Sequence, residues 1–357
     1  MLSEKDLNDI AQNLLISLIN IPSVSREEDK TANFLQAFFT SLSIPSERIE
    51  NNVIVRSKHF SDSKPTILLN SHHDTVKPIE GWNTEPCKAI EKDGKIIGLG
   101  SNDAGAPLVC LIATFLHFYK SENLLYNLIL VASGEEEVSG NKGIECVLPQ
   151  LGKIDLGIVG EPTNMNLAIA QKGLVVLDCS AKGKAGHAAH NTGENAIYKA
   201  MQDITWIQTF QFPKQTTVLG PVKMTVTCIQ AGTQHNVIPA ECNFTIDVRT
   251  NECYTNQEVY EIVKSSIQSE VTARSFRLNS THISENHPIV KRAIELGLQT
   301  YGSPTLSDQT FMTQFPSVKI GPGDTLRSHT ANEFILESEI QHGIQIYIQL
   351  LTNLNIL

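Results

Sequence analysis

Apolar residues recur along the chain with two different spacings, one helical and one extended. Residues 3–19 carry apolar side chains every three or four positions, which predicts a helix that Ser3 can cap. Short, almost wholly apolar runs are instead typical of strands buried inside a parallel sheet. Such runs occupy residues 65–69, 128–132 and 156–159. Because helical and extended segments alternate, we predict an α/β domain with a mixed, largely parallel sheet.

The pattern changes between residues 172 and 285. Strands with alternating apolar and polar positions occur there together with helices that have one apolar face, in the order strand, helix, strand, strand, helix, strand. This order predicts a small α+β sandwich inserted into the first domain. We therefore predict a first domain of residues 1–171 and 286–357 and an inserted domain of residues 172–285.

Composition narrows the possible partners. The chain has 357 residues, 41% of them hydrophobic, and a formal charge of −10, which argues against nucleic acid as a partner. Its seven cysteines form no CxxC pair, so we expect reduced thiols and a cytoplasmic location. We also expect no membrane association, because the chain shows no secretory signal and no apolar run of membrane-spanning length.

Histidine and acidic residues follow the predicted buried strands. His72 and Asp74 come after the first apolar run, and side chains two positions apart on a strand point the same way. The adjacent carboxylates from Glu135 to Glu137 follow the second run, and Glu161 follows the third. Ligands gather at the carboxyl ends of strands in open α/β sheets. A nearby dication would remove the cost of placing three adjacent carboxylates at a buried strand end.

Two further candidates lie in loops. Asp103 follows Gly98 and Gly100 and precedes a predicted buried helix at 108–118, and His329 lies in a glycine-rich segment near the end of the chain. Each cluster also has a purely structural interpretation. The alternatives are a surface histidine pair, a helix cap at Asp103, a solvated acidic run and an ordinary loop histidine.

Together, these clusters resemble the acetylornithine deacetylase / succinyl-diaminopimelate desuccinylase family of di-zinc deacylases and exopeptidases, over essentially the whole chain. The resemblance implies a zinc-peptidase-type catalytic domain and an inserted lid and dimerisation domain. The matching motifs are His72-His73-Asp74, Asp103 after Gly-x-Gly, Glu135-Glu136, Gly160-Glu161-Pro162-Thr163, His329 followed by Glu333, Gly186-His187, Asn236-Val237-Ile238-Pro239 and Asp247-Val248-Arg249.

The resemblance implies two metal ions per subunit. His72, Asp103 and Glu161 would hold one ion, and Asp103, Glu136 and His329 would hold the other. Nitrogen and oxygen donors of this kind suit Zn²⁺, with Co²⁺ or Mn²⁺ as alternatives. One bridging carboxylate leaves room for a water molecule between two ions about 3.5–4 Å apart.

The resemblance also implies catalytic roles. Asp74 would accept a hydrogen bond from His72, Glu135 would be the general base, and His187 would donate to the developing oxyanion. A guanidinium group matches a carboxylate with two parallel hydrogen bonds. The expected substrate-binding residues are Arg249, Asn236 and Lys172, and the alternative for Arg249 is a surface salt bridge at a strand end.

Three positions depart from the family pattern. The lysine often found two positions after the bridging aspartate is Gly105 here, so that supporting cation is missing. Gly134 stands where an aspartate usually precedes the glutamate pair, and with Glu137 following, the pair can be shifted by one residue. His73 can compete with His72, although only His72 keeps the His-x-Asp spacing.

We predict hydrolysis of an N-acyl amino acid to a carboxylate and a free amine. The preferred substrate is N2-acetylornithine, or N-acetyl- or N-succinyl-citrulline, in arginine biosynthesis. The alternatives are succinyl-diaminopimelate desuccinylase of lysine biosynthesis and a di- or tripeptide exopeptidase. A non-catalytic binding protein on the same fold is a more remote alternative.

The position of His187 predicts that the protein is an oligomer. It lies on a glycine-rich turn of the inserted domain, so it can reach the metal ions only through domain closure or from a second subunit. The family resemblance favours the second route, a two-fold homodimer formed through the inserted domain. The alternative is a turn histidine without a partner.

Overall fold

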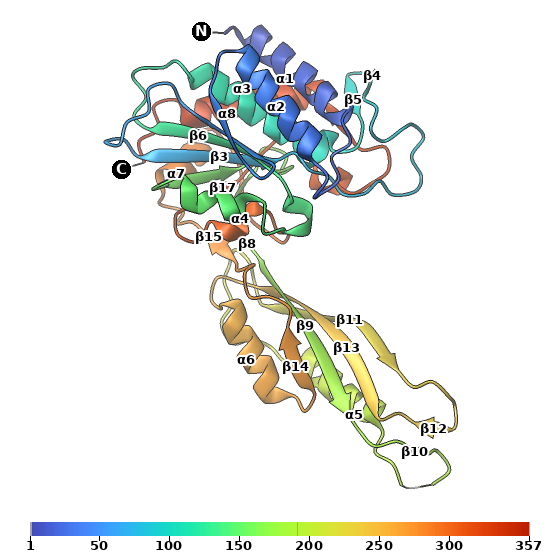
Figure 1. Cartoon of the computed structure of the whole chain (residues 1–357). Coiled ribbons are helices and arrows are strands. Elements are labelled where there is room, and N and C mark those ends of the chain that lie inside the picture. The colour runs from blue at the N-terminus through green and yellow to red at the C-terminus, as the bar shows by residue number, and fades with distance from the viewer. Residues whose placement is uncertain (1, 191, 357) are drawn as a thin grey trace. The chain divides into compact units, whose positions relative to one another are not determined.

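The computed structural model describes residues 2–190 and 192–356, which form two compact units (Figure 1). The first unit comprises the chain up to residue 169 together with residues 283–301 and those from 307 onwards. The second comprises residues 170–282 and 302–306. Segment 302–306, which the sequence pattern placed in the first domain, belongs to the second unit because the Lys172 N–H donates to the Ser303 carbonyl at 3.0 Å.

A mixed sheet forms the centre of the first unit. In spatial order its strands are β1 (Ser46–Ile49), β2 (Asn52–Arg56), β6 (Asn127–Ser133), β3 (Thr66–His72), β7 (Leu156–Val159), β17 (Ser317–Lys319) and β8 (Leu167–Gln171). The central strand β3 runs parallel to β6 and β7, and β7 runs parallel to β17. The remaining pairs are antiparallel. The predicted α/β class with a mixed, largely parallel sheet is confirmed.

Helices cover this sheet through their apolar faces. α1 (Glu4–Ile19) begins at Ser3, whose hydroxyl accepts the Asp6 N–H, as predicted. Figure 1 shows α1, α3 (Ala106–Phe118) and α8 (Glu337–Leu351) on one side of the sheet and the short α4 (Ile144–Val147) on the other. The first unit also contains α2 (Asp29–Ser41) and α7 (Pro288–Glu295).

A second, smaller sheet lies beside the predicted site. It consists of β4 (Ile90–Lys92), β5 (Lys95–Ile97) and β18 (Phe334–Leu336), with β5 in the middle. β5 leads into the loop that carries Asp103, and β18 follows the loop that carries His329. This sheet therefore brings together two segments that are more than two hundred residues apart in the chain.

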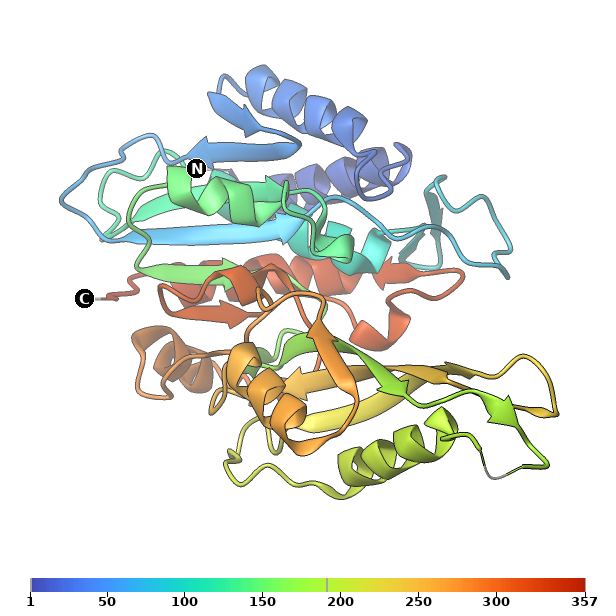
Figure 2. The ribbon, with the colours of Figure 1, turned by 60° about the horizontal axis from the view of Figure 1, so that its bottom comes forward.

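The second unit is an antiparallel sheet with two helices. Its strand order is β11 (Lys223–Ala231), β13 (Glu241–Thr250), β9 (Gly173–Lys182) and β14 (Glu270–Ala273). The helices α5 (Ala196–Thr209) and α6 (Asn256–Ser266), visible beside these strands in Figure 2, contribute to one apolar core with them. The two-residue strands β10 (Gly186–His187) and β12 (Val237–Ile238) pair at one end. The predicted strand and helix order is observed.

One predicted helix end is wrong. The sequence pattern extends the last helix of the second unit to Glu270, whereas α6 ends at Ser266. The cause is Asp203, whose carboxylate accepts the backbone N–H groups of Gln268 and Ser269 and so holds that segment in a non-helical conformation. β15 (Thr281–His282) and β16 (Thr300–Ser303) both pair with β8 and belong to the central sheet. Among the described helices, none is both long enough and apolar enough to cross a membrane.

Candidate metal centre

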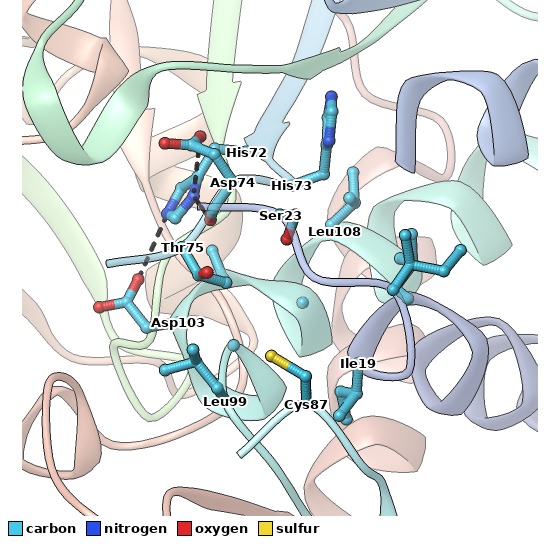
Figure 3. Close-up of a pocket in the computed structure, with 15 residues that line it drawn as sticks. Ile19, Ser23, His72, His73, Asp74, Thr75, Cys87, Leu99, Asp103 and Leu108 are labelled. Carbon is cyan, nitrogen blue, oxygen red and sulfur yellow. Dashed lines mark hydrogen bonds and ion pairs between the residues drawn. The ribbon is translucent and has the colours of Figure 1, made fainter. Parts of the chain in front are cut away.

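His72 is the last residue of the central strand β3, and its side chain is buried. Nδ1 lies 2.9 Å from the Asp74 backbone oxygen. A carbonyl oxygen only accepts, so Nδ1 carries a proton and Nε2 faces the carboxylates. Nε2 lies 3.3 Å from Asp103 Oδ1, as the dashed line in Figure 3 shows. The side chains of His72 and Asp103, both selected by the sequence analysis, therefore meet at this strand end.

The candidate ligands form two overlapping pockets that share Asp103. In the first, His72 Nε2 lies 3.3 Å from Asp103 Oδ1 and 3.9 Å from Glu161 Oε1. In the second, His329 Nε2 lies 3.7 Å from Asp103 Oδ2 and 3.0 Å from Glu137 Oε2. The two oxygens of Asp103 thus face different histidines. This is the geometry that a bridging carboxylate requires.

The second pocket corrects the predicted ligand set. The sequence analysis assigned Glu136 to it, whereas the structure places Glu137 there. Glu136 instead lies in the first pocket, with Oε2 at 3.7 Å from His72 Nε2. Two groups of potential ligand atoms are close enough to hold a cation: His72, Asp103 and Glu137, and His72, Glu136 and Glu161.

Glu135, the predicted general base, does not face the cluster. Its backbone is left-handed, with φ +55°, two residues after the end of β6. Its carboxylate turns toward the Lys142 N–H, 3.4 Å away, and lies against Gly140. A Cβ on Gly140 would lie 1.9 Å from Glu135 Oε2, so only glycine fits there. The glutamate pair that faces the cluster is therefore one residue later than predicted.

Asp74 explains this shift. Its carboxylate accepts the backbone N–H groups of Glu136 and Glu137, at 3.1 and 3.2 Å, and the Ser25 hydroxyl at 2.6 Å. It thereby fixes the backbone of the pair that faces the cluster. The expected hydrogen bond between Asp74 and His72 is made by the Asp74 backbone oxygen, with the carboxylate 3.5 Å from the ring.

His73 does not compete with His72. Figure 3 shows its ring directed away from Asp103. Its Nδ1 lies 2.8 Å from the Thr31 hydroxyl, and its Nε2 lies 2.9 Å from the Asn51 backbone oxygen. Burial lowers the pKa of His73. It is a core histidine whose two nitrogens are already hydrogen-bonded.

The charges of the cluster are those of a cation site. Burial, together with the Asp103 carboxylate, raises the pKa of Glu161 to about 8. Burial also raises the pKa of Glu136 well above its usual value. For His72, burial lowers the pKa, but the Glu136, Asp103 and Asp74 carboxylates outweigh it and hold the pKa well above 6.5. Without a cation, Glu161 therefore keeps at neutral pH a proton that an ordinary glutamate releases. Dications would fit this donor set.

The sequence analysis missed a buried cation. Lys319 lies on β17 opposite Val159, two residues before Glu161, and is 2% exposed. Burial lowers the pKa of Lys319, while the Glu161, Glu136 and Asp103 carboxylates act in the opposite direction. Its amine group therefore lies near three carboxylates of the cluster. A single lysine in the strand Val318-Lys319-Ile320 was the available signal.

Asp308 is a second buried group that the sequence analysis missed. Its carboxylate accepts the Ser133 hydroxyl at 2.5 Å, and burial raises its pKa to about 6. Ser133 is the last residue of β6, so this contact supports the strand end that precedes the three glutamates. Nothing in the spacing around Asp308 distinguished it from a surface aspartate.

A pocket adjoins the cluster, and His72, His73 and Asp103 line it together with several apolar side chains. Figure 3 shows Ile19, Cys87, Leu99 and Leu108 around it. The apolar surroundings lower the local dielectric constant and so strengthen the electrostatic interactions of the cluster.

The second unit carries the remaining predicted residues. His187 is exposed on β10, where its Nδ1 accepts the Ala189 N–H at 3.1 Å. The backbone oxygen of Asn236 accepts the Ala188 N–H at 2.9 Å, so both predicted residues lie at the paired tip of β10 and β12. The Asn236 side chain is exposed.

Arg249 and Lys172 belong to a cationic group in the same unit. Arg249 Nε and Nη2 donate to the Asp247 carboxylate at 2.8 and 3.0 Å. Lys172 Nζ donates to the Pro221 carbonyl at 2.9 Å. Burial and the neighbouring charges of Lys223 and Arg249 lower the pKa of Lys172. Three cations thus lie close together, with Asp247 holding the guanidinium in a fixed orientation.

Known proteins match this chain over most of its length. The sequence model of peptidase family M20/M25/M40 matches residues 68–353. A succinyl-diaminopimelate desuccinylase from Legionella pneumophila is 26% identical over 308 residues, covering 80% of each chain. A second curated protein of that name, from Rickettsia felis, is 27% identical over 385 residues, covering 95% of this chain and 98% of its own.

Solved structures share the fold. The aminopeptidase PepT from Bacillus cereus has a TM-score of 0.77 at 18% identity, covering 96% of this chain and 98% of its own. The Bacillus subtilis YXEP protein, described as a dinuclear metal binding peptidase from the M20 family, has a TM-score of 0.75 at 18% identity, covering 99% of this chain and all of its own. The family-level resemblance inferred from the motifs is confirmed.

Proposed function

Because the chain belongs to peptidase family M20/M25/M40 and is a hydrolase of that family, we propose that it cleaves the amide bond of an N-acyl amino acid with two divalent cations bound at the paired pockets. The observation that carries this proposal is the shared aspartate. Asp103 directs one oxygen to His72 and the other to His329. A site built only to bind a ligand does not need this arrangement, whereas a dinuclear centre does.

The residues that would hold the two cations are His72, Asp103 and Glu161 in the first pocket and Asp103, Glu137 and His329 in the second. Imidazole nitrogens and carboxylate oxygens suit Zn²⁺, with Co²⁺ or Mn²⁺ as alternatives. When bound, two such cations lower the pKa of a water molecule and polarise the amide carbonyl.

Glu136 is the general base in this proposal, in place of Glu135. The family pattern assigns the first glutamate of the pair to proton transfer and the second to the metal. Since Glu137 faces His329, the pair is Glu136-Glu137. Glu136 takes a proton from the attacking water and delivers it to the leaving amine nitrogen. His187 donates a hydrogen bond to the oxyanion, and we propose that a second copy of the chain supplies it in a homodimer.

The substrate is an amino acid with a free carboxylate and an acylated amine. Arg249, held by Asp247, and Lys172 supply the cations for this carboxylate, and Asn236 supplies a further polar contact. The curated relatives favour N-succinyl-diaminopimelate over the N2-acetylornithine or citrulline derivatives that the sequence analysis preferred. The cationic group of Lys172, Lys223 and Arg249 supports a succinylated substrate, because a succinyl group adds a further carboxylate that these positive charges attract.

The test is an activity panel with a metal control. Acetylated and succinylated ornithine, citrulline, lysine and diaminopimelate, together with a tripeptide, are assayed with added Zn²⁺. We expect hydrolysis of at least one N-acyl amino acid, its loss after dialysis against a chelator, and recovery with Zn²⁺ or Co²⁺. Full activity in rigorously metal-free protein, or cleavage of the tripeptide alone, would contradict the proposal.

A further inference from the structure

The loops that carry Asp103 and His329 are joined at their bases. β5 and β18 pair antiparallel, with Phe334 opposite Ile97. The Gly98 N–H then donates to the Glu333 backbone oxygen at 3.0 Å. The chain after β5 and the chain before β18 therefore leave this small sheet side by side, and each continues into one candidate ligand of the second pocket.

Glu333 links the second loop to the first. Its carboxylate is 2% exposed. It accepts backbone N–H groups from Gly100 at 3.2 Å, from Asn102 at 2.7 Å and from Asp103 at 2.9 Å. Burial raises the pKa of Glu333 to about 7, while these three N–H donors favour its ionised form. Since one donor is the N–H of Asp103 itself, Glu333 directly fixes the backbone of the shared ligand.

Asn102 links the first loop to the second. Its Nδ2 donates to the Asp324 carbonyl at 3.0 Å, and its Oδ1 accepts the Asp324 N–H at 3.1 Å. Nδ2 also lies 3.3 Å from the hydroxyl of Ser328, the residue before His329. Gly323 permits this approach, because a Cβ there would lie 2.3 Å from Asn102 Oδ1.

Each of these two side chains extends from its own loop and binds the backbone of the other loop. Glu333, from the His329 loop, binds the backbone around Asp103, and Asn102, from the Asp103 loop, binds the backbone before His329. We propose that Asn102 and Glu333 form a reciprocal clamp that fixes Asp103 relative to His329, and so keeps the second pocket in the geometry that binds a cation. Both are positioning residues, since neither faces the pocket as a ligand in this assignment.

The clamp predicts an effect confined mainly to one pocket. His329 lies on a loop and depends on the clamp for its distance to Asp103. In the first pocket only the shared Asp103 depends on the clamp, because His72 ends β3 and Glu161 follows β7, where strand pairing holds them. Removing residues that orient metal ligands typically weakens metal binding by about 10–100-fold. We expect a loss of this size at the second pocket and a smaller change at the first.

The experiment is a titration of metal-free protein with Co²⁺ alone, followed by visible absorption and calorimetry. The variants are Glu333→Gln and Asn102→Ala. In Glu333→Gln, the side-chain NH₂ group replaces an oxygen that accepts a backbone N–H, so at least one hydrogen bond is lost. Asn332→Gly is the matched control, because Asn332 lies in the same loop but binds Gly81 and Asn83 instead of the Asp103 loop. Glycine also tolerates its φ of +60°.

The expected result is weaker binding of the second Co²⁺ in both test variants, with two-step binding as in the wild type for Asn332→Gly. Unchanged second-ion affinity in either variant would overturn the clamp, as would equal weakening of both ions. If Asn102→Ala does not fold, the Glu333→Gln result alone decides. The inference rests on the proposed function, and the two fail separately: a wild type that binds no pair of ions contradicts the metal centre, whereas normal binding by wild type and variants contradicts only the clamp.

Discussion

His329 Nε2 lies 3.0 Å from Glu137 Oε2, and this contact assigns the second pocket of the cluster. The two residues are far apart in the chain, yet they meet beside Asp103, whose Oδ2 is 3.7 Å from the same nitrogen. Because Glu137 occupies this position, the preceding glutamate lies beside His72 and the one before that faces Lys142. Three contacts thus distinguish three adjacent, chemically identical residues.

The first prediction separates these three glutamates. Glu136→Gln should retain two bound ions but lose about 10²–10⁴-fold in kcat, the range expected for loss of general acid–base catalysis. Glu137→Gln should lose affinity for one ion. Glu135→Gln is the control and should keep both ions and most of the activity. Metal analysis by mass spectrometry and steady-state kinetics measure these effects. Normal metal content in Glu137→Gln, with ion loss in Glu135→Gln, would restore the original register.

The second prediction concerns pH. In the metal-free protein, the hydrogen bond to Glu137 raises the pKa of His329 to about 9, and burial with Asp103 raises that of Glu161 to about 8. Both groups therefore hold a proton at pH 7, and a cation must displace it. We expect release of at least about two protons on full loading at pH 7. Affinity should rise with pH until these groups have lost their protons, near pH 9.

Calorimetry of metal binding in buffers with different ionisation enthalpies measures this proton release. His329→Asn should release about one proton fewer than the wild type. An affinity that does not change between pH 6 and pH 9 would be inconsistent with protonated ligands in the metal-free site.

The third prediction concerns the substrate carboxylate. Asp247 occupies Nε and Nη2 of Arg249, which leaves the Nη1 edge of the guanidinium for a carboxylate. Arg249→Lys should raise KM by about 10–100-fold, since hydrogen bonds to charged groups contribute about 1.5–3 kcal/mol, and should change stability little. Arg274→Lys is a matched control, because Arg274 binds Asp178 in the same two-bond manner within the same unit. An equal KM for both variants would remove this role from Arg249.

The fourth prediction tests a homodimer in which His187 acts on its partner's site. His187→Ala and Glu136→Gln should each be nearly inactive alone. In a mixed dimer, one of the two sites combines an intact His187 with an intact Glu136. Random pairing of equal amounts should recover up to about a quarter of wild-type activity under subunit exchange. Demonstrated exchange without recovered activity would assign His187 to its own chain or to no catalytic role.

The sequence determined the architecture because the signals for it are local. Apolar runs at 65–69 and 128–132 became the central strands β3 and β6, buried at every position, and Ser3 caps α1 as its hydroxyl predicts. The ends of those strands also located most of the cluster. His72 and Glu161 meet where the sequence placed them, because the parallel strands β3 and β7 end at the same edge of the sheet.

Only the tertiary structure decided which neighbour of a given kind faces the cluster. Glu135, Glu136 and Glu137 are identical in composition and differ only in backbone direction. That direction is set by the left-handed conformation of Glu135 and by the Asp74 carboxylate, which lies more than sixty residues away in the chain. Lys319 and Glu333 likewise act through contacts between distant segments, and no local spacing reports such contacts. Local periodicity fixes which elements form, whereas long-range hydrogen bonds and buried charge fix where individual side chains point.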